Sequence, residues 1–329
     1  MKTAFLFLLG VTCFGCRLGD EILPTAEIET IEPARPGTDS IRDALDRAHH
    51  AYGAGDHRKM IEELGTVLAD PEADDAARAN AIELVDAALV DSKGKLDSGF
   101  ELPAGITWMR LLFQQADRDG TPAYLAMLNG GLEPGVEIDE IRFVRERDGK
   151  VLASRKSQLG YFESGKEKDQ PFFYIHTTDA RSPMGAGAYR IEWTFADGRS
   201  GSSRVVVPTL KLADLPRIIE PARGDASGDQ PTIRWQPPSW ITEKPFGRVL
   251  VEVRRESYAP RVGQRWATWS EDSELTQIKV GDGGEPPGAH LDAGESYSAA
   301  VQYQWRIQYG DLQLGSVARA QREITVGSR

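Results

Sequence analysis

The sequence predicts a mainly β protein, with two antiparallel β-sandwiches in series preceded by a small α-helical segment. Apolar residues recur with helical spacing only between residues 38 and 91. From residue 100 onward, short stretches of alternating apolar and polar residues are separated by turns that contain glycine and aspartate. No helical pattern interrupts these strands, which favours antiparallel pairing over a parallel sheet.

Three helices are predicted between residues 38 and 91. The first begins at Ser40, and Gly53 and Gly55 separate it from the second. The pair Asp70-Pro71 suits the start of the third, because proline is tolerated in the first turn of a helix. Each helix has an apolar stripe that must be covered by the β part, a second copy or a partner. The stripes are Ile41, Ala44, Leu45, Ala48 and Tyr52; Met60, Ile61, Leu64, Val67 and Leu68; and Ala77, Ala81, Leu84, Val85, Ala88 and Leu89.

The first β segment, residues 100–210, contains two predicted hairpins. Arg147-Asp148-Gly149 and Asp197-Gly198 are turn sequences of the kind that join antiparallel strands. The strands around them are expected at 140–146, 150–154, 188–195 and 203–207, and a further strand is expected at 106–113.

The second β segment covers residues 215–329. Val249, Val251 and Val253 alternate with polar residues, which predicts a strand with one face in a core. Gly281–Gly288 is interpreted as a loop. Other strands are expected at 218–221, 232–236 and 319–326.

Several motifs resemble known families. The three helices resemble one and a half tetratricopeptide-type repeats. Gly185–Trp193 resembles the Gly-x-Tyr segment of bacterial immunoglobulin-like domains, which implies that Tyr189 is a tyrosine-corner residue. Thr232–Pro238, which includes Trp235, and Leu291–Tyr297 resemble the second strand and the tyrosine corner of fibronectin type III domains. These resemblances imply a helical segment at 38–99, an immunoglobulin-like sandwich at 100–210 and a fibronectin type III-like sandwich at 215–329.

Residues 1–16 have the layout of a secretory signal. Lys2 precedes a short apolar run, Phe5–Val11, that is too short to span a bilayer. Gly15-Cys16 then resembles the lipobox of bacterial lipoproteins, which implies cleavage before Cys16 and lipidation of its thiol. The acidic stretch 17–37 contains three prolines and no periodicity, so it is interpreted as a flexible tether.

Charge and cysteine content narrow the classes of function. The chain has 39 basic and 50 acidic residues, and its net charge of -11 argues against nucleic acid and against a polybasic membrane patch. Both cysteines, Cys13 and Cys16, lie in the leader, so disulfides, thiol catalysis and cysteine metal sites are not expected. No cofactor or metal is predicted. Arg17 stands where enteric inner-membrane lipoproteins carry aspartate, which implies the outer membrane.

Candidate catalytic and metal motifs have simpler interpretations. His49, His50 and His57 could be metal ligands, but no His-Glu-x-x-His pattern is present, which favours solvated histidines at a helix end. Gly198–Ser202 misses the nucleophile elbow by one residue, and Ser92–Lys95 lacks the companion motifs of Ser-x-x-Lys enzymes. Carboxylates are abundant, yet no pair stands out as a glycosidase pair. An enzyme is therefore not predicted.

Five of the seven tryptophans lie in the last segment. Trp235 and Trp305 are expected in the core. Trp266 and Trp269 are three residues apart, so on a regular strand they face opposite sides and one of them faces outward. Trp240 follows two prolines in an expected loop. Trp240, together with Trp266 or Trp269, is the candidate site for a sugar or a peptide.

These observations favour a non-catalytic lipoprotein of the cell envelope that acts as a scaffold, interaction module or accessory subunit of an envelope assembly. Its expected partners are the membrane, through the N-terminal lipid, and an envelope protein that docks on the helical segment. The alternative is a surface carbohydrate-binding or adhesion protein that uses the aromatic-rich last segment. An enzyme would require a deep cleft with converging acids at the junction of the sandwiches.

Overall fold

The structure is a computed structural model, and the part that it describes is mainly β, as predicted, with long helices only at its N-terminal end. The predicted signal sequence, Cys16 and the tether lie outside the described residues. No helix of the described part is long and apolar enough to cross a membrane. The described residues are 38–118, 121–156, 160–161, 171–177, 184–209, 214–222, 226–242, 246–255 and 264–327.

Three helices form the N-terminal segment, as predicted, but the third begins later than expected. The structure places Asp70-Pro71 after the second helix, where the Asp70 backbone N–H bonds back to the last helical turn. The third helix begins at Asp75, because the Asp74 carboxylate accepts a 2.7 Å hydrogen bond from the Ala77 N–H and caps it. The helices are α1 (Thr38–Gly53), α2 (His57–Ala69) and α3 (Asp75–Asp91).

The strands of the described part form one large sheet and two small ones. The ten-stranded sheet has the order β14 (Gln264–Ser270), β13 (Phe246–Arg255), β16 (Ser296–Tyr309), β17 (Leu312–Val326), β2 (Ile106–Arg118), β3 (Thr121–Leu132), β7 (Pro171–His176) and β6 (Gly160–Tyr161), with β1 (Lys95–Leu96) on β16 and β11 (Ala226–Ser227) on β17. The four-stranded sheet has the order β5 (Lys150–Lys156), β4 (Ile138–Arg145), β8 (Gly187–Phe195) and β9 (Ser200–Val207). The three-stranded sheet has the order β10 (Arg217–Glu220), β12 (Thr232–Gln236) and β15 (Gln277–Lys279).

Both predicted hairpins are confirmed. β4 and β5 are joined through the short 3-10 helix η1 (Glu146–Asp148) and Gly149, whose φ of 63° favours glycine. β8 and β9 are joined through Asp197-Gly198, and the Gly198 φ of 86° requires the same freedom. The glycines of these two turns therefore fix the register of the four-stranded sheet.

Two tyrosine corners also form as the resemblances imply. The Tyr189 hydroxyl donates a 2.8 Å hydrogen bond to the carbonyl oxygen of Gly185, four residues upstream. In the last segment, the Tyr297 hydroxyl accepts a 2.8 Å bond from the Asp292 backbone N–H and lies 3.0 Å from the Asp292 carboxylate. Each corner fixes the chain where it enters a long central strand.

β17 connects the two β segments that the sequence divides. It pairs with β16 from Leu312 to Thr325, and Leu312–Gln321 also pair in parallel with Met109–Arg118 of β2. The last strand of the chain therefore lies beside the first strand of the 100–210 segment. The two sandwiches share one continuous sheet.

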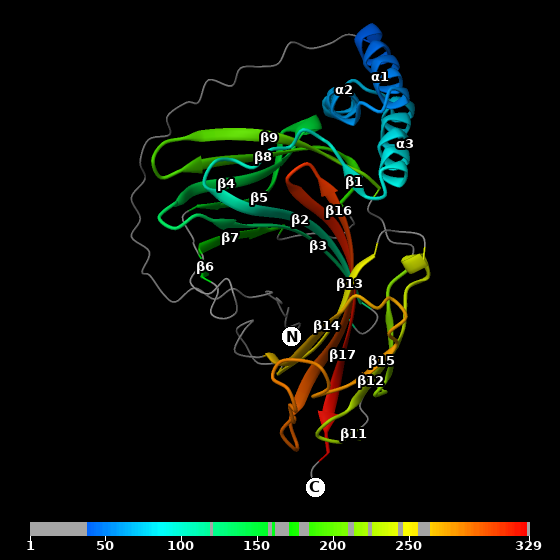
Figure 1. The fold of residues 1–329 in the computed structure, drawn as a ribbon, viewed down its shortest axis with the longest axis vertical. Coiled ribbons are helices and arrows are strands. Elements are labelled where there is room, and N and C mark those ends of the chain that lie inside the picture. The colour runs from blue at the N-terminus through cyan, green and yellow to red at the C-terminus, as the bar shows by residue number, and fades with distance from the viewer. Residues whose placement is uncertain are drawn as a thin grey trace, which may run out of the picture.

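The two small sheets pack on the same face of the large sheet (Figure 1). Tyr303 and Tyr309 lie six residues apart on β16, so both side chains point to one face. Trp235 Nε1 of β12 donates a 2.8 Å hydrogen bond to the Tyr303 hydroxyl. The Tyr309 hydroxyl accepts a 3.0 Å bond from the Val206 backbone N–H of β9. The large sheet bends between these contacts, so its other face is concave (Figure 1).

The helical segment packs on the four-stranded sheet of the same chain. Helix α2 contacts β8, β9 and η1, and its Met60 and Leu64 are fully buried. Gly65 allows α2 to approach Arg204 of β9 closely, since a Cβ atom at this position would lie 2.6 Å from Arg204 Cδ. Arg204 in turn donates a 2.5 Å bond from Nε to the Glu146 carboxylate. The sequence predicts that the apolar stripes of the helices are covered by the β part, a second copy or a partner. In the structure, the β part of the same chain covers the stripe of α2.

Replacing Tyr309 tests the contact between the large sheet and β9. In Tyr309→Phe the Val206 N–H of β9 loses its partner inside the core, so we expect the free energy of unfolding to fall by about 1–3 kcal/mol. Urea denaturation measures this change. The matched control is Tyr124→Phe, because the Tyr124 hydroxyl bonds to no described residue; equal losses in the two variants would contradict the assigned role.

Candidate functional site

Of the three candidate binding tryptophans, the structure leaves one accessible. Trp240 is a candidate binding residue because the sequence places it in a loop, but the structure buries it: the side chain is 2% exposed and its Nε1 donates a 2.9 Å bond to the Asp214 carbonyl oxygen. The Asp214 carboxylate also binds the Ser239 N–H and turns the loop inward. Trp266 is fully buried, whereas Trp269 is 45% exposed, which confirms that one of this pair faces outward. Trp235 and Trp305 are in the core, as predicted.

The alternative catalytic and metal motifs occupy positions that the fold explains. His49 Nε2 lies 2.9 Å from the Asn80 side-chain oxygen, and the described residues contain no group of three His, Cys, Asp or Glu side chains that could hold a metal ion. Gly198–Ser202 runs from a hairpin turn into β9, so it has no helix after the serine. Ser92 lies at the end of α3, where its hydroxyl donates to the Leu89 carbonyl.

Three arginines gather on the concave face of the large sheet. Arg248 of β13 pairs with Gln304 of β16, and Arg306 follows two residues later on the same face. Arg110 of β2 pairs with Gln313 of β17. Gln313 also pairs with Gln308 of β16, which lies two residues beyond Arg306. We call Arg110, Arg248 and Arg306 the guanidinium cluster.

Neutral groups hold the cluster together. The Gln304 amide oxygen accepts 3.2 Å hydrogen bonds from both Arg248 Nε and Arg306 Nε. The Arg248 guanidinium carbon lies 3.5 Å from the centroid of the exposed Trp269 ring, which is a cation–π contact. Arg110 makes a longer contact of the same kind, at 4.9 Å, with Trp108.

Burial, and after it charge repulsion within the cluster, lowers the pKa values of Arg248 and Arg306. Burial, followed by the charges of Arg306 and Arg110, lowers the pKa of Arg248 to about 10. Burial and the charge of Arg110 also lower the pKa of Arg306. With a pKa of about 10, Arg248 remains cationic at neutral pH. Within the described part of the chain, neither Arg248 nor Arg306 forms an ion pair, so these two guanidinium groups are a local positive site on an acidic protein.

A second group of charges on the same face is compensated. Glu252 is 2% exposed, and its carboxylate lies 2.7 Å from an Arg319 nitrogen and 2.8 Å from an Arg254 nitrogen. Burial by itself would raise the pKa of Glu252, but the two arginines outweigh burial and lower it. Arg319 also donates to the Gln302 amide oxygen. These residues form a closed ionic network that stabilises the sheet.

Replacing Glu252 tests this network. Because the folded-state pKa lies below the ordinary value of 4.5, the carboxylate stabilises the protein above that pH, and the contribution is lost as pH falls through the folded-state pKa. In Glu252→Gln we expect a loss of about 3 kcal/mol at neutral pH, because Arg319 is left buried without its counter-charge. Stability measured from pH 7 to 3 should then vary less in the variant than in the parent. Glu220→Gln, in an exposed pair with Arg234, is the control and should have a much smaller effect.

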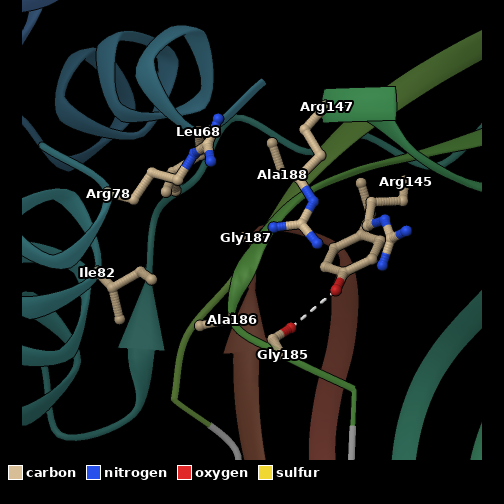
Figure 2. A pocket seen from close by; sticks show the side chains of 10 residues that line it. Leu68, Arg78, Ile82, Arg145, Arg147, Gly185, Ala186, Gly187 and Ala188 are labelled. Atoms are coloured by element: carbon tan, nitrogen blue, oxygen red, sulfur yellow. Dashed lines mark hydrogen bonds between the residues drawn. The ribbon is translucent and has the colours of Figure 1, made fainter. Parts of the chain in front are cut away.

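A small pocket lies between the helical segment and β8, with a volume of about 80 Å³ (Figure 2). Two of the arginines that line it already have hydrogen-bond partners. Arg78 donates a 2.7 Å bond to the Asp70 carbonyl oxygen, and Arg145 donates a 2.9 Å bond to the Asp148 carboxylate. Arg147 is exposed at its edge. The hydrogen bond from Arg145 lowers the pKa of Asp148 to about 2, so this carboxylate stays charged. The pocket is lined by Leu68, Arg78, Ile82, Arg145, Arg147 and residues 185–189.

Comparisons with known proteins give distant likenesses of fold. No family model and no curated protein matches the chain. Fibronectin(III)-like modules of Clostridium thermocellum CbhA match at 12% identity and a TM-score of 0.21, over 67% of this chain and 94% of that chain. The 47-kilodalton lipoprotein Tp47 of Treponema pallidum matches at 12% identity and 0.21, over 67% and 53%. SGBP-B of Bacteroides ovatus, solved with a mixed-linkage heptasaccharide, matches at 14% identity and 0.16, over 65% and 45%. At such TM-scores, none of these proteins bears on the function of the chain.

The guanidinium cluster was not predicted from the sequence. Arg110 and Arg306 are far apart along the chain, and only the parallel pairing of β2 with β17 brings their strands together. A local signal does exist, because Arg306 stands between the core residues Trp305 and Ile307, which places it on the opposite face of a strand. That signal identifies one outward arginine but not its neighbours.

Proposed function

We propose that the chain is a non-catalytic lipoprotein of the cell envelope that acts as an interaction module and binds another envelope protein. The observation that carries this proposal is the concave face of the large sheet, which presents Trp269 beside the guanidinium cluster. The described small sheets pack on the opposite face, and α2 packs on β8, β9 and η1. Tryptophan and arginine are enriched among the residues that dominate protein–protein binding energy.

The helical segment is the second candidate docking surface. The apolar stripe of α2 is already covered by β8 and β9, which leaves the outward sides of α1 and α3. Val90 of α3 is 75% exposed, the largest exposed fraction among the large hydrophobic side chains of the described part. A single exposed valine is common on protein surfaces, so the concave sheet face is the stronger candidate.

Carbohydrate binding is the alternative function, and the exposure of Trp269 is the observation that favours it. Aromatic rings on β-sheets can stack on sugar faces. With Trp240 and Trp266 buried, however, Trp269 is the only one of the three candidate tryptophans that a sugar could reach. One face of its ring is already in contact with Arg248. A platform of several rings is therefore not formed by these residues.

Site-specific photocrosslinking in the native cells tests the docking surface. With p-benzoylphenylalanine in place of Trp269, we expect a discrete crosslinked adduct with an envelope protein, because that side chain is exposed on the concave face. The same group at Val90 tests the helical segment, and Val151 of β5, which is 38% exposed, is the matched control. An adduct only from position 90 would move the docking surface to the helices. Adducts from none of these positions would contradict the proposed function.

Membrane attachment is tested separately with the two cysteines. In Cys16→Ser we expect the protein to move from the membrane fraction to the soluble fraction, because the proposed lipid would have no thiol to join. Cys13→Ser is the control and should remain in the membrane fraction. Density separation of the two membranes then tests the outer-membrane location. Retention of Cys16→Ser in the membrane would contradict lipid anchoring through Cys16.

A further inference from the structure

We propose that the guanidinium cluster binds the carboxylates of an acidic polypeptide segment of the protein partner. This inference rests on the proposed function and deepens it, because it states the chemistry of the partner. Within the described residues Arg248 and Arg306 have no counter-charge, their guanidinium groups suit oxyanions, and their surroundings favour a polypeptide over a glycan.

The cluster differs from the other groups of arginines in the described part of the chain. The other half of the concave face places two arginines around Glu252, and the pocket beside α3 pairs Arg145 with Asp148. In the cluster, Arg248 and Arg306 instead share the oxygen of Gln304, a neutral acceptor. A structural ion pair has its counter-charge within the fold. Arg248 and Arg306 are half-buried and have no such counter-charge among the described residues, which indicates that an external anion completes the site.

The guanidinium groups of the cluster suit carboxylates. A guanidinium presents several N–H donors in one plane and matches the two oxygens of a carboxylate. Gln304 occupies only the Nε side of Arg248, and the contact with Trp269 lies on the face of its guanidinium plane. Gln304 also accepts bonds from both Nε and Nη2 of Arg306, which leaves the Nη1 side of that guanidinium for a ligand. Two arginines that converge from β13 and β16 can therefore bind neighbouring carboxylates. The protein carries a net charge of -11, so this cluster is where an acidic partner would be attracted rather than repelled.

The surroundings of the cluster favour a polypeptide over a sugar polymer. A sugar polymer needs accessible ring faces, but Arg248 covers one face of Trp269 at 3.5 Å, and Trp240 and Trp266 are buried. An acidic peptide needs only the guanidinium groups and an apolar edge for its backbone or side chains. Trp269, which is 45% exposed, supplies that edge. The observations therefore favour an acidic polypeptide.

Isothermal titration of the full chain in detergent tests the proposal with three probes: decaglutamate, a galacturonate oligomer with the same number of carboxylates, and decaglutamine. We expect decaglutamate to bind and the other two to bind more weakly or not at all. The double variant Arg248→Gln/Arg306→Gln should weaken decaglutamate binding about tenfold or more. The matched control, Arg42→Gln/Arg217→Gln, removes the same charge from two exposed arginines outside the cluster and should change binding little.

A thermal melt of the same variants separates binding from folding. Because like charges are removed, the cluster variant should melt at the same temperature as the parent or higher, whereas a structural role would lower its melting temperature. The inference is overturned if decaglutamate does not bind, if both double variants weaken binding equally, or if the galacturonate oligomer binds more tightly than decaglutamate. If the crosslink from position 269 persists in the cluster variant, the proposed function stands and this inference fails.

Discussion

The parallel pairing of β17 with β2 is the constraint on which the rest of the structure depends. It places the last strand of the chain beside the first long strand of the 100–210 segment, with Leu312–Gln321 opposite Met109–Arg118. The strands of both β segments thereby become one sheet, and the register of that sheet decides which side chains share its concave face. Arg110 lies near Arg306 only because of this pairing. A one-residue slip of β2 against β17 would turn Arg110 to the core and Met109 to the concave face.

The contacts on the other face follow from the same sheet. Tyr303 and Tyr309 point to one side of β16, and each provides a hydroxyl group to a different small sheet, through Trp235 and through Val206. The Val206 contact satisfies a backbone N–H on β9, the outer strand of its sheet, and an unpaired N–H in a buried position would be costly. The helical segment then covers β8 and β9. Each layer is thus positioned by the one beneath it.

Local features of the fold could be predicted from the sequence, whereas the site could not. Turn glycines and tyrosine corners depend on residues that are close along the chain, so Gly149, Gly198 and Tyr189 were identified correctly. The start of α3 was misplaced, because proline after aspartate suits both a helix start and the turn in which Pro71 lies. The burial of Trp240 depends on Asp214, 26 residues earlier, and no local pattern shows such a contact. The guanidinium cluster depends on pairing between strands that are distant in the sequence.

The shared sheet also has a mechanical consequence. Two sandwiches joined only by a linker can swing about it, whereas here any change of angle would have to break hydrogen bonds between β17 and β2 along ten residue pairs. β16 and β17 run together from the end near β1 to the C-terminal end of the molecule (Figure 1). Tension applied between the helical segment and the C-terminus would act along β16 and β17. The hydrogen bonds between these two strands would then be loaded in shear and would have to break together. We therefore expect the described part of the chain to be mechanically stiff and to transmit tension without a change in the angle between the sandwiches.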